Sequence, residues 1–509
     1  MASKNDVQQF VLLPIRGLRA QGRTASAETR NFLMDANSQF LAASVKKSAV
    51  SGRGFSLVST VTPSVKMRVL DSISEDGAKL VELSSKQSLA LRENQPGLKL
   101  VPVVYFYPQV QRRKIESKFA AAPTVKLRLT VVSKADGKPV ADAKVIAFTD
   151  FTNRIGAEGM TNSKGIVDLA LGGMSKKLER IYIYPLRNFW SLFQKNVTIN
   201  SGDQIQLTPV DLSFTDSLRH FYGNAPDNAG DGVKVAVLDS GIALDHPDLT
   251  VIGGENTVFG EAASDFGDNG GGGHGSHVAG IIAARGKPPT GIRGLAPKCD
   301  LFSFRVFGRN VEGASNFAIA KAIDRAVQMG CDLINMSLGG GDPDEATRAA
   351  MEDAQAQGSL VLVASGNDDR SPVSFPASFS PPAIAVSAMG RKGTFPPGTG
   401  ADDTVAEPFG KDPNNFIASF SNIGQEIDLT CAGVGVVSTV PDGYAPMDGT
   451  SMATPAVTGF VANLLSGRHD ILTMVRDPGR TNAMAKALFA KAKLMGFGTE
   501  FEGQGFPRK

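Results

Sequence analysis

The stretch VAVLDSGIALDHPDL, residues 235–249, decides how the fold of this 509-residue chain is interpreted. It opens as a short apolar strand that ends on Asp239, and a small turn sequence follows. The rest of residues 209–509 alternates such strands with amphipathic helices, for example a helix over 317–330 and a strand over 360–367. This alternation predicts an α/β fold, with a doubly wound, mostly parallel sheet covered by helices on both faces.

Polar or small residues follow the carboxyl ends of several of these expected strands. Asp239, Gly339 and Asn367 each lie at such an end. In open α/β sheets, ligands and reacting groups gather outside the carboxyl ends of the strands. We therefore expect the functional site at this edge of the sheet.

Two further segments carry side chains that suit acyl transfer. GGGHGSHVAG (271–280) places His274 among glycines at the start of an expected helix, which leaves the imidazole accessible. DGTSMATPAVTG (448–459) places Ser451 at the start of another helix, where free N–H groups and the helix dipole stabilise negative charge. A serine nucleophile needs a base for its proton and an acid that orients this base. His274 and Asp239 fit these two roles.

Each residue also has a simpler interpretation. A lone Asp-Ser-Gly sequence is typical of a turn, and an Asn such as Asn367 is common in turns. His274 and His277, three residues apart, suit a metal site, but no third ligand of the HExxH type accompanies them. The combination of the motifs is more specific than any one of them.

The three motifs and their order, Asp then His then Ser, resemble those of subtilisin-like serine peptidases. The resemblance implies that Ser451 attacks the scissile carbonyl, that His274 relays the proton and that Asp239 orients the imidazole. It also implies that Asn367, in LVLVASGND, stabilises the oxyanion together with the Ser451 N–H.

The resemblance further assigns supporting and substrate-binding residues. His246 and His277 are implied as supporting residues, and Asp368 at the pocket rim could admit a basic side chain. Otherwise the pocket is expected to accept large apolar or uncharged side chains. Its implied lining consists of Ser337, Leu338 and Gly339 on one wall, Ala364, Ser365 and Gly366 on the other, and Ser374 near the floor.

No cofactor is expected for the chemistry, whereas structural calcium stays an open alternative. Asp248 matches one ligand of the calcium site found in the family. The asparagine-containing loop expected after the His helix is replaced by a basic loop over 285–293, which puts that site in doubt. Residues 391–415 form a Gly-, Pro- and Asp-rich insertion relative to small subtilisins, and we expect a surface loop there.

The first part of the chain is expected to hold an inhibitory domain. Residues 1–108 have the pattern of a small α+β unit and resemble the propeptide of subtilisins, whose final strand, here KLVPVVYFYP (99–108), leads into the substrate cleft. Residues 109–122 are polar, basic and accessible, so we expect any self-cleavage there rather than between Tyr107 and Pro108. The N-terminal unit is thus expected to act as an intramolecular inhibitor.

Residues 123–208 change to a period of two, with short strands and Asp-Gly or Lys-Gly turns. This pattern predicts a β-sandwich. Its sequence resembles those of the Ig-like, carboxypeptidase-regulatory-like modules that accompany many peptidases. A spacer or docking role and a ligand-binding role both stay open. Residues 209–509 are then the subtilisin-like domain.

Charge and composition limit the partners. The net charge is +9 over residues 1–120, +5 over 121–208 and −11 over 209–509, which indicates either uneven solvated surface or complementarity between the basic and acidic parts. The sequence has no basic stripe with interleaved aromatic residues, so it does not predict nucleic-acid binding. No window of the sequence is apolar enough to predict a membrane span. Three widely spaced cysteines predict core packing rather than disulfides. The start of the chain does not read as a signal peptide, so we expect a cytoplasmic protein.

The resulting hypothesis is a serine endopeptidase made as an autoinhibited zymogen, with a polypeptide as substrate. Two alternatives stay open. One is a latent intracellular protease that a partner releases, and the other is a catalytically silent scaffold that binds through its β-sandwich.

Overall fold

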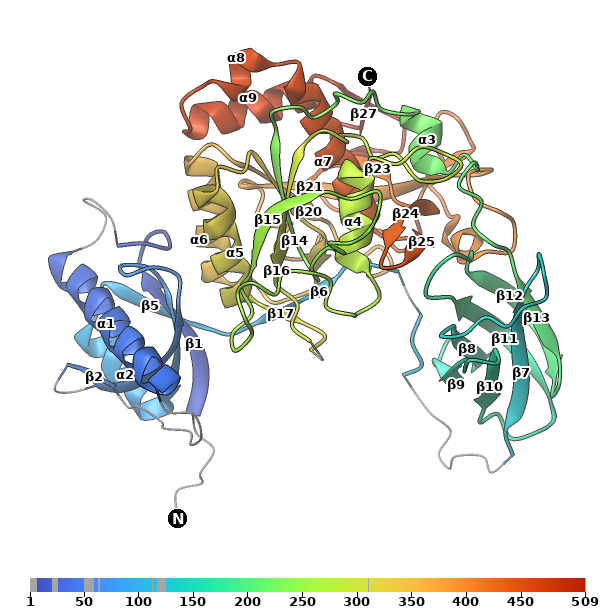
Figure 1. Ribbon diagram of the computed structural model, residues 1–509, viewed down its shortest axis with the longest axis horizontal. Helices are drawn as coiled ribbons and strands as arrows, with labels where there is room; N and C mark the ends of the chain where they lie inside the picture. The colour runs from blue at the N-terminus through green and yellow to red at the C-terminus, as the bar shows by residue number, and fades with distance from the viewer. Residues whose placement is uncertain are drawn as a thin grey trace.

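The computed structural model describes residues 7–20, 26–49, 59–62, 65–111, 113–116, 125–309 and 311–508. Three bodies are visible in Figure 1: an N-terminal unit (7–102), a central α/β domain (217–508) and a β module (125–207). The N-terminal unit and the β module lie on different sides of the α/β domain (Figure 1). Within the described part of the chain, no helix has the length and apolar character needed to cross a membrane.

The α/β domain is built on an eight-stranded sheet. Its strand order is β15-β16-β14-β18-β20-β21-β22, and β23 also pairs with β21. All pairs are parallel except β21 with β22. The strands are β14 (Lys234–Asp239), β15 (Val251–Asn256), β16 (Asp300–Arg305), β18 (Leu333–Met336), β20 (Leu360–Ala364), β21 (Ala383–Arg391), β22 (Asn415–Ile417) and β23 (Ile427–Ala432).

Helices cover both faces of this sheet, as the alternation predicts. On β14, Val235 and Val237 face the core shared with α4 and α7, whereas Ala236 and Leu238 face α5 and α6. Because both faces are buried, the strand is apolar throughout. The helices are α4 (His274–Ala283), α5 (Asn316–Gln328), α6 (Glu345–Ala356) and α7 (Thr450–Ser466), together with α3 (Ser217–Tyr222), α8 (His469–Leu472), α9 (Pro478–Phe489) and α10 (Thr499–Glu502). The three cysteines are buried and unpaired.

The N-terminal unit is an antiparallel sheet with two helices on one face. The strand order is β2-β3-β4-β1-β5. On β1, Phe10 and Leu12 pack with the helices, whereas Val11 and Leu13 pack with residues of α5 and α6 in the α/β domain. The elements are β1 (Val7–Pro14), α1 (Ala27–Ala49), β2 (Ser59–Thr62), β3 (Val65–Ser72), β4 (Lys79–Ser84), α2 (Ser85–Asn94) and β5 (Leu98–Pro102). Residues 50–58, which include most of one expected strand, lie outside the described residues.

The apolar run 99–108, expected as one strand, is divided in the structure. β5 ends at Pro102 in the sheet of the N-terminal unit, whereas β6 (Tyr105–Pro108) belongs to the α/β domain. There β6 lies between β17 (Ala314–Ser315) and β19 (Leu338–Gly339), antiparallel to both. The chain therefore leaves one sheet and enters another within a run of uniformly apolar composition.

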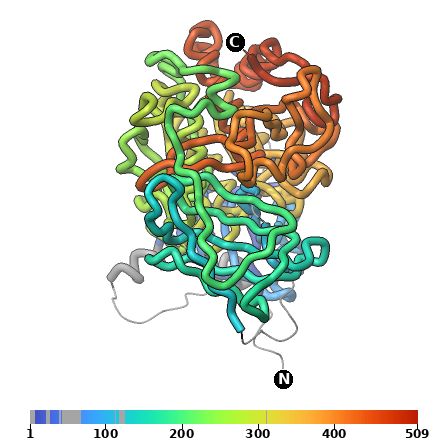
Figure 2. Tube along the Cα trace, turned by 90° about the vertical axis from the view of Figure 1, so that its right-hand side faces the viewer, coloured from blue at the N-terminus to red at the C-terminus, as the bar shows by residue number. Residues whose placement is uncertain are grey.

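The β module consists of two sheets packed face to face. One has the order β10-β7-β13 and the other β12-β11-β8-β9, with a shared apolar core between them. The second face of the four-stranded sheet carries its own apolar cluster, which includes Phe148, Tyr182 and Phe193. The strands are β7 (Leu127–Ser133), β8 (Lys144–Asp150), β9 (Ile155–Met160), β10 (Ile166–Leu169), β11 (Ser175–Tyr184), β12 (Leu192–Asn200) and β13 (Gln204–Leu207). Figure 2, viewed from the module's side, shows it directly against the α/β domain.

Candidate active site

Asp239 and His274 lie side by side at the carboxyl end of the sheet. Asp239 is the last residue of β14, and His274 is the first residue of α4. The His274 Nδ1 lies 2.7 Å from the Asp239 Oδ1, which also accepts a hydrogen bond from the Ser240 N–H at 2.7 Å. The helix approaches this closely because residue 275 is glycine: a Cβ there would lie 2.3 Å from the Gly241 carbonyl oxygen. Asp239 can thus orient the imidazole through one ring nitrogen and leave the other free.

The Ser451 hydroxyl points away from His274 in this structure. Ser451 lies in the first turn of α7, and its Oγ donates to the Ser337 carbonyl oxygen at 2.8 Å. His274 Nε2 is buried and, among the described atoms, has no hydrogen-bond partner. The fold thus brings the three predicted triad residues to one edge of the sheet, and the hydrogen bond between the second and third is not formed.

The main chain of Ser451 meets a carbonyl group from the segment that follows β6. The Ser451 N–H donates to the Gln109 carbonyl oxygen at 3.1 Å. Asn367 Oδ1 accepts from the Thr450 N–H at 3.0 Å, while Asn367 Nδ2 is buried without a partner among the described atoms. A Cβ on Gly449 would lie 2.3 Å from the Gln109 oxygen and 3.3 Å from Asn367 Nδ2, so both atoms lie against the same bare glycine. One donor, the Ser451 N–H, therefore binds this carbonyl oxygen, and a second, Asn367 Nδ2, lies on the same side of Gly449 without a partner among the described atoms.

The chain runs through this site in an extended, strand-paired conformation. In the antiparallel pairing with β19, Pro108 lies opposite Leu338 and Tyr107 opposite Gly339. The next residue continues the pattern, because the Gln109 N–H donates to the Ser337 carbonyl oxygen at 3.2 Å. Beyond it, the Gln111 N–H donates to the Asp448 carbonyl oxygen at 2.7 Å. Main-chain bonds thus hold residues on both sides of the Gln109–Val110 peptide bond.

The predicted pocket residues surround Gln109. A Cβ on Gly339 would lie 3.4 Å from the Gln109 side-chain nitrogen and 2.8 Å from Ser374 Oγ. On the opposite side, Ser374 Oγ donates to the Ser365 carbonyl oxygen at 3.1 Å. The walls predicted from sequence, residues 337–339 and 364–366, therefore meet at Ser374. The Asp368 carboxylate, expected at the rim, accepts a hydrogen bond from Asn422 at 3.0 Å.

His277 and His246 have structural contacts. His277 Nε2 lies 2.9 Å from the Ala445 carbonyl oxygen, and burial lowers the pKa of His277 to about 3, so the ring is neutral. His246 Nδ1 accepts from the Asp248 N–H at 3.1 Å, and its Nε2 lies 3.0 Å from the Gly443 carbonyl oxygen. Both rings thus fasten α4 and its neighbouring turn to β25 (Gly443–Met447).

The Asp248 carboxylate does not fit a calcium site. Its Oδ2 accepts hydrogen bonds from the Ile292 N–H at 2.8 Å and from the Tyr444 hydroxyl at 2.9 Å. The loop 285–293 therefore folds over this carboxylate with donors instead of oxygen ligands. No group of three His, Cys, Asp or Glu side chains suited to a metal ion occurs in the described part of the chain.

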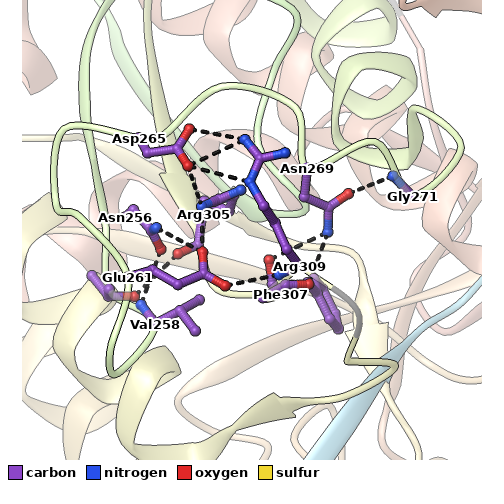
Figure 3. Close-up of polar contacts among 11 residues, drawn as sticks. Asn256, Val258, Glu261, Asp265, Asn269, Gly271, Arg305, Phe307 and Arg309 are labelled. Carbon is purple, nitrogen blue, oxygen red and sulfur yellow. Dashed lines mark hydrogen bonds and ion pairs between the residues drawn. The ribbon is translucent and has the colours of Figure 1, made fainter.

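A charged cluster holds the loop that leads into His274 (Figure 3). Arg305, fully buried at the end of β16, donates to Glu261 and, at 3.0 Å, to Asp265. Arg309 binds the same two carboxylates through its main-chain N–H and its side chain (Figure 3). Nearby, Asn269 accepts from the Gly271 N–H at 2.7 Å and so orders the glycine run before His274.

Sequence reasoning missed three participants in the site. The sequence predicts that Gln109 belongs to an accessible linker, whereas in the structure its carbonyl group lies in the site. Asn422 is fully buried and bonds to both the main chain and the side chain of Asp368, but its surroundings carry no motif. Asp448, whose carboxylate accepts from the Gly435 N–H, directly precedes the Gly449-Thr450-Ser451 motif, and that adjacency was the available signal. Burial raises the pKa of Asp448 to about 6.

Comparisons with known proteins show the family of the α/β domain. Residues 230–506 match the model of the subtilase family. Subtilisin BL of Lederbergia lenta is 40% identical over 234 residues, which cover 46% of this chain and 76% of that protein. Subtilisin DY of Bacillus licheniformis is 38% identical over 242 residues, 47% of this chain and 78% of that protein. Alkaline elastase YaB of Bacillus sp. (strain YaB) is 40% identical over 234 residues, 46% of this chain and 54% of that protein.

An α/β sheet with paired Asp and His at its carboxyl edge, and a Ser at a helix start, defines a hydrolase of the serine peptidase class. With the matches above, the chain belongs to the subtilase family. It is a subtilisin-like serine endopeptidase with polypeptide substrates, and its chemistry needs no cofactor. The likeness to the α/β domain leaves the N-terminal unit and the β module unassigned.

Proposed function

We propose that Asp239, His274 and Ser451 form the catalytic triad and that Asn367 completes the oxyanion hole. The observation that carries the proposal is the Gln109 carbonyl oxygen. It accepts a hydrogen bond from the Ser451 N–H and lies beside the unpartnered Asn367 Nδ2. A preorganised pair of donors around a carbonyl oxygen is what acyl transfer requires.

In the proposed reaction, the Ser451 hydroxyl turns from the Ser337 carbonyl toward His274 Nε2. His274 takes the hydroxyl proton as Ser451 Oγ bonds to the scissile carbonyl carbon, and Asp239 stabilises the resulting imidazolium. The imidazolium then gives its proton to the leaving amine as the C–N bond breaks. Water repeats the sequence on the acyl-enzyme ester and releases the new carboxyl terminus.

The chain is further proposed to be an autoinhibited zymogen whose first substrate is its own Gln109–Val110 bond. Strand pairing of β6 with β17 and β19 supports this, because it aligns the chain as a polypeptide substrate would be aligned. This bond lies at the start of the region 109–122 predicted for self-cleavage. The basic residues Arg113 and Lys114 lie on the carboxyl side of this bond. Residue 112, which belongs to the same basic run, is outside the described residues. In this proposal residues 1–109 are the inhibitory propeptide.

Labelling by a fluorophosphonate probe tests the proposed site. The wild-type enzyme should become labelled on Ser451, and Ser451→Ala should not. Asn367→Ala should lower kcat by about 10²–10³ with little change in KM, the effect known for the oxyanion asparagine of subtilisin. Labelling that persists in Ser451→Ala, or an Asn367→Ala effect confined to KM, contradicts the assignment.

A further inference from the structure

The β module is fixed to the α/β domain by a buried anchor. Trp190, the only tryptophan of the chain, is 3% exposed and belongs to the apolar core of the α/β domain, where it packs against Phe214. Next to it, Asn188 exchanges hydrogen bonds with the main chain of Tyr444 in β25 at 2.6 and 3.2 Å. The module therefore has a set position beside the hairpin that leads to the nucleophile.

The insertion 391–415 provides the second attachment. Expected to be a surface loop, it instead contacts the module: the Gly398 carbonyl oxygen accepts from the Phe193 N–H at 2.8 Å. Asp403, whose side chain is 6% exposed, accepts from Arg180 at 2.9 Å and from the Tyr182 hydroxyl at 2.7 Å. A buried carboxylate with these donors holds the four-stranded sheet of the module against the cleft.

The residues after the Gln109–Val110 bond run between the β module and the α/β domain. Val110 and Gln111 line a small pocket together with residues 445–448 of the α/β domain and, from the module, Tyr184, Pro185, Leu186, Phe189 and Ser191. Further along, a main-chain hydrogen bond joins Arg113 to the Tyr184 hydroxyl, whose pKa burial raises. The module therefore contacts the main chain of this segment as well as its side chains.

Two side chains of the segment have defined neighbours. The Arg113 guanidinium lies 3.4 Å from Asp369 and from Asp403 and 5.6 Å from the centre of the Phe151 ring. Ile115 packs on the aromatic face of the four-stranded sheet, with Phe148, Tyr182 and Phe193 among its neighbours. Counted from the proposed scissile bond, these are the fourth and sixth residues on its carboxyl side.

We propose that the β module forms the far side of the substrate cleft and binds the residues that follow the scissile bond. The ligand is an extended polypeptide with a basic residue at the fourth position and an apolar residue at the sixth. The chain's own residues 110, 111 and 113–116 are the first occupant. This inference rests on the proposed function, since the register is counted from Gln109.

Two peptide substrates and one anilide test the proposal. An internally quenched peptide with the chain's own 105–116 sequence is compared with one that carries Ala at the fourth and sixth positions after the bond. The third substrate ends at the Gln109 position as a p-nitroanilide and never reaches the module. The enzyme is self-cleaved, freed of residues 1–109, and carries Arg113→Ala and Ile115→Asp so that its own segment no longer fills the fourth and sixth positions. Trp190 fluorescence reports that the module stays docked.

We expect the native-sequence peptide to be cleaved about tenfold faster, in kcat/KM, than the Ala peptide. Adding Asp369→Asn should lower this preference about threefold, with each rate divided by that variant's anilide rate. Asp369 lies in the α/β domain, at the edge that faces Arg113. Asp168→Asn removes the same charge from the module's three-stranded sheet, which makes none of the contacts described above, and should keep the full preference.

Equal rates for the two peptides, or a preference that Asp369→Asn and Asp168→Asn leave equally intact, overturns the inference. These outcomes differ from a failure of the proposed function. An enzyme that does not turn over the anilide lacks the proposed chemistry, and the inference then falls with it. An enzyme that cleaves the anilide but does not distinguish the peptides has the chemistry without the proposed module subsite.

Discussion

The N-terminal unit and the β module are attached to the same α/β domain by different kinds of contact. The N-terminal unit lays one sheet face on α5 and α6 and adds ion pairs, among them Arg19 with Asp324 and Lys321 with Asp71. The β module inserts Trp190 into the domain's core. These ion pairs are partly buried, so salt weakens them only in part, whereas it does not weaken core packing. In the proposed maturation, the unit before the Gln109–Val110 bond is therefore the part that leaves, and the module after it stays attached.

The largest effect is expected from the loss of the proposed base, because neither unit is then separated from the α/β domain by self-cleavage. His274→Ala should lower peptide turnover by about 10⁶, the size of the loss that a triad member causes in subtilisin, because the triad acts as a unit. Both units should then stay on one uncut chain, as judged by its intact mass. Turnover near the wild-type rate would show that His274 is not the base.

Removing the Trp190 side chain should lower the free energy of unfolding more than removing any single contact of the N-terminal unit. Trp190→Ala, made in Ser451→Ala to prevent autolysis, should lower the free energy of unfolding by about 3–5 kcal/mol because a cavity opens in the core. Met160→Ala, on an exposed position of the same module, serves as the control. Denaturant titration measures both, and equal stabilities would mean that the module is only loosely tethered.

Asp448, in the wall between the cleft and the module, should give the chain a pH-dependent stability. Its folded pKa of about 6 exceeds the ordinary 3.8, so the native state binds more protons than the unfolded state between these values. This contribution is complete below pH 3.8 and is lost as the pH rises through 6, about 3 kcal/mol in all.

Asp448→Asn keeps an acceptor for the Gly435 N–H and cannot ionise. In the Ser451→Ala background it should therefore be more stable than the parent at pH 7.5 and about equally stable near pH 4. Urea titrations at the two pH values measure the difference. A stabilisation of the same size at both pH values would show that the carboxyl group does not titrate in this range.

The smallest effect concerns the release of the N-terminal unit. Arg19→Gln removes a guanidinium that contacts Asp324 at 2.8 Å, so the released 1–109 fragment should inhibit the processed enzyme about tenfold more weakly at low salt. Arg68→Gln is the matched control, because Arg68 pairs with Glu82 inside the same unit. The gap between the two fragments should narrow at high salt. Identical inhibition constants for the two variants would show that the Arg19–Asp324 ion pair does not contribute to the binding of the fragment.

Local patterns predicted much of the α/β domain and brought attention to the residues of the proposed triad. β14, α4 and α7 could be placed because apolar strands, glycine runs and a Gly-Thr-Ser start are properties of neighbouring residues. The division of 99–108 could not be predicted, because both halves are apolar and only tertiary contact separates β5 from β6. The same holds for the insertion 391–415, whose loop-like composition conceals that Asp403 meets Arg180, 223 positions earlier.

The predicted charge complementarity between the basic N-terminal unit and the acidic α/β domain holds for only some of the ion pairs between them. Arg19 with Asp324 and Lys99 with Glu345 pair a basic N-terminal residue with an acidic partner, but Lys321 with Asp71 has the opposite polarity. The apolar face of β1 lies in the same interface. Net charges over whole regions cannot show which side chains meet, so only part of this interface should respond to salt.

The central claim is that the chain binds its own Gln109–Val110 bond as a substrate. Intact mass and N-terminal sequencing of the purified wild type beside Ser451→Ala test it most directly. The account predicts a wild-type chain that begins at Val110 with the sequence VQRRKIE, keeps the β module, and accompanies a released 1–109 fragment, whereas Ser451→Ala stays uncut. A mature N-terminus near residue 209, or the same cut in Ser451→Ala, would contradict it.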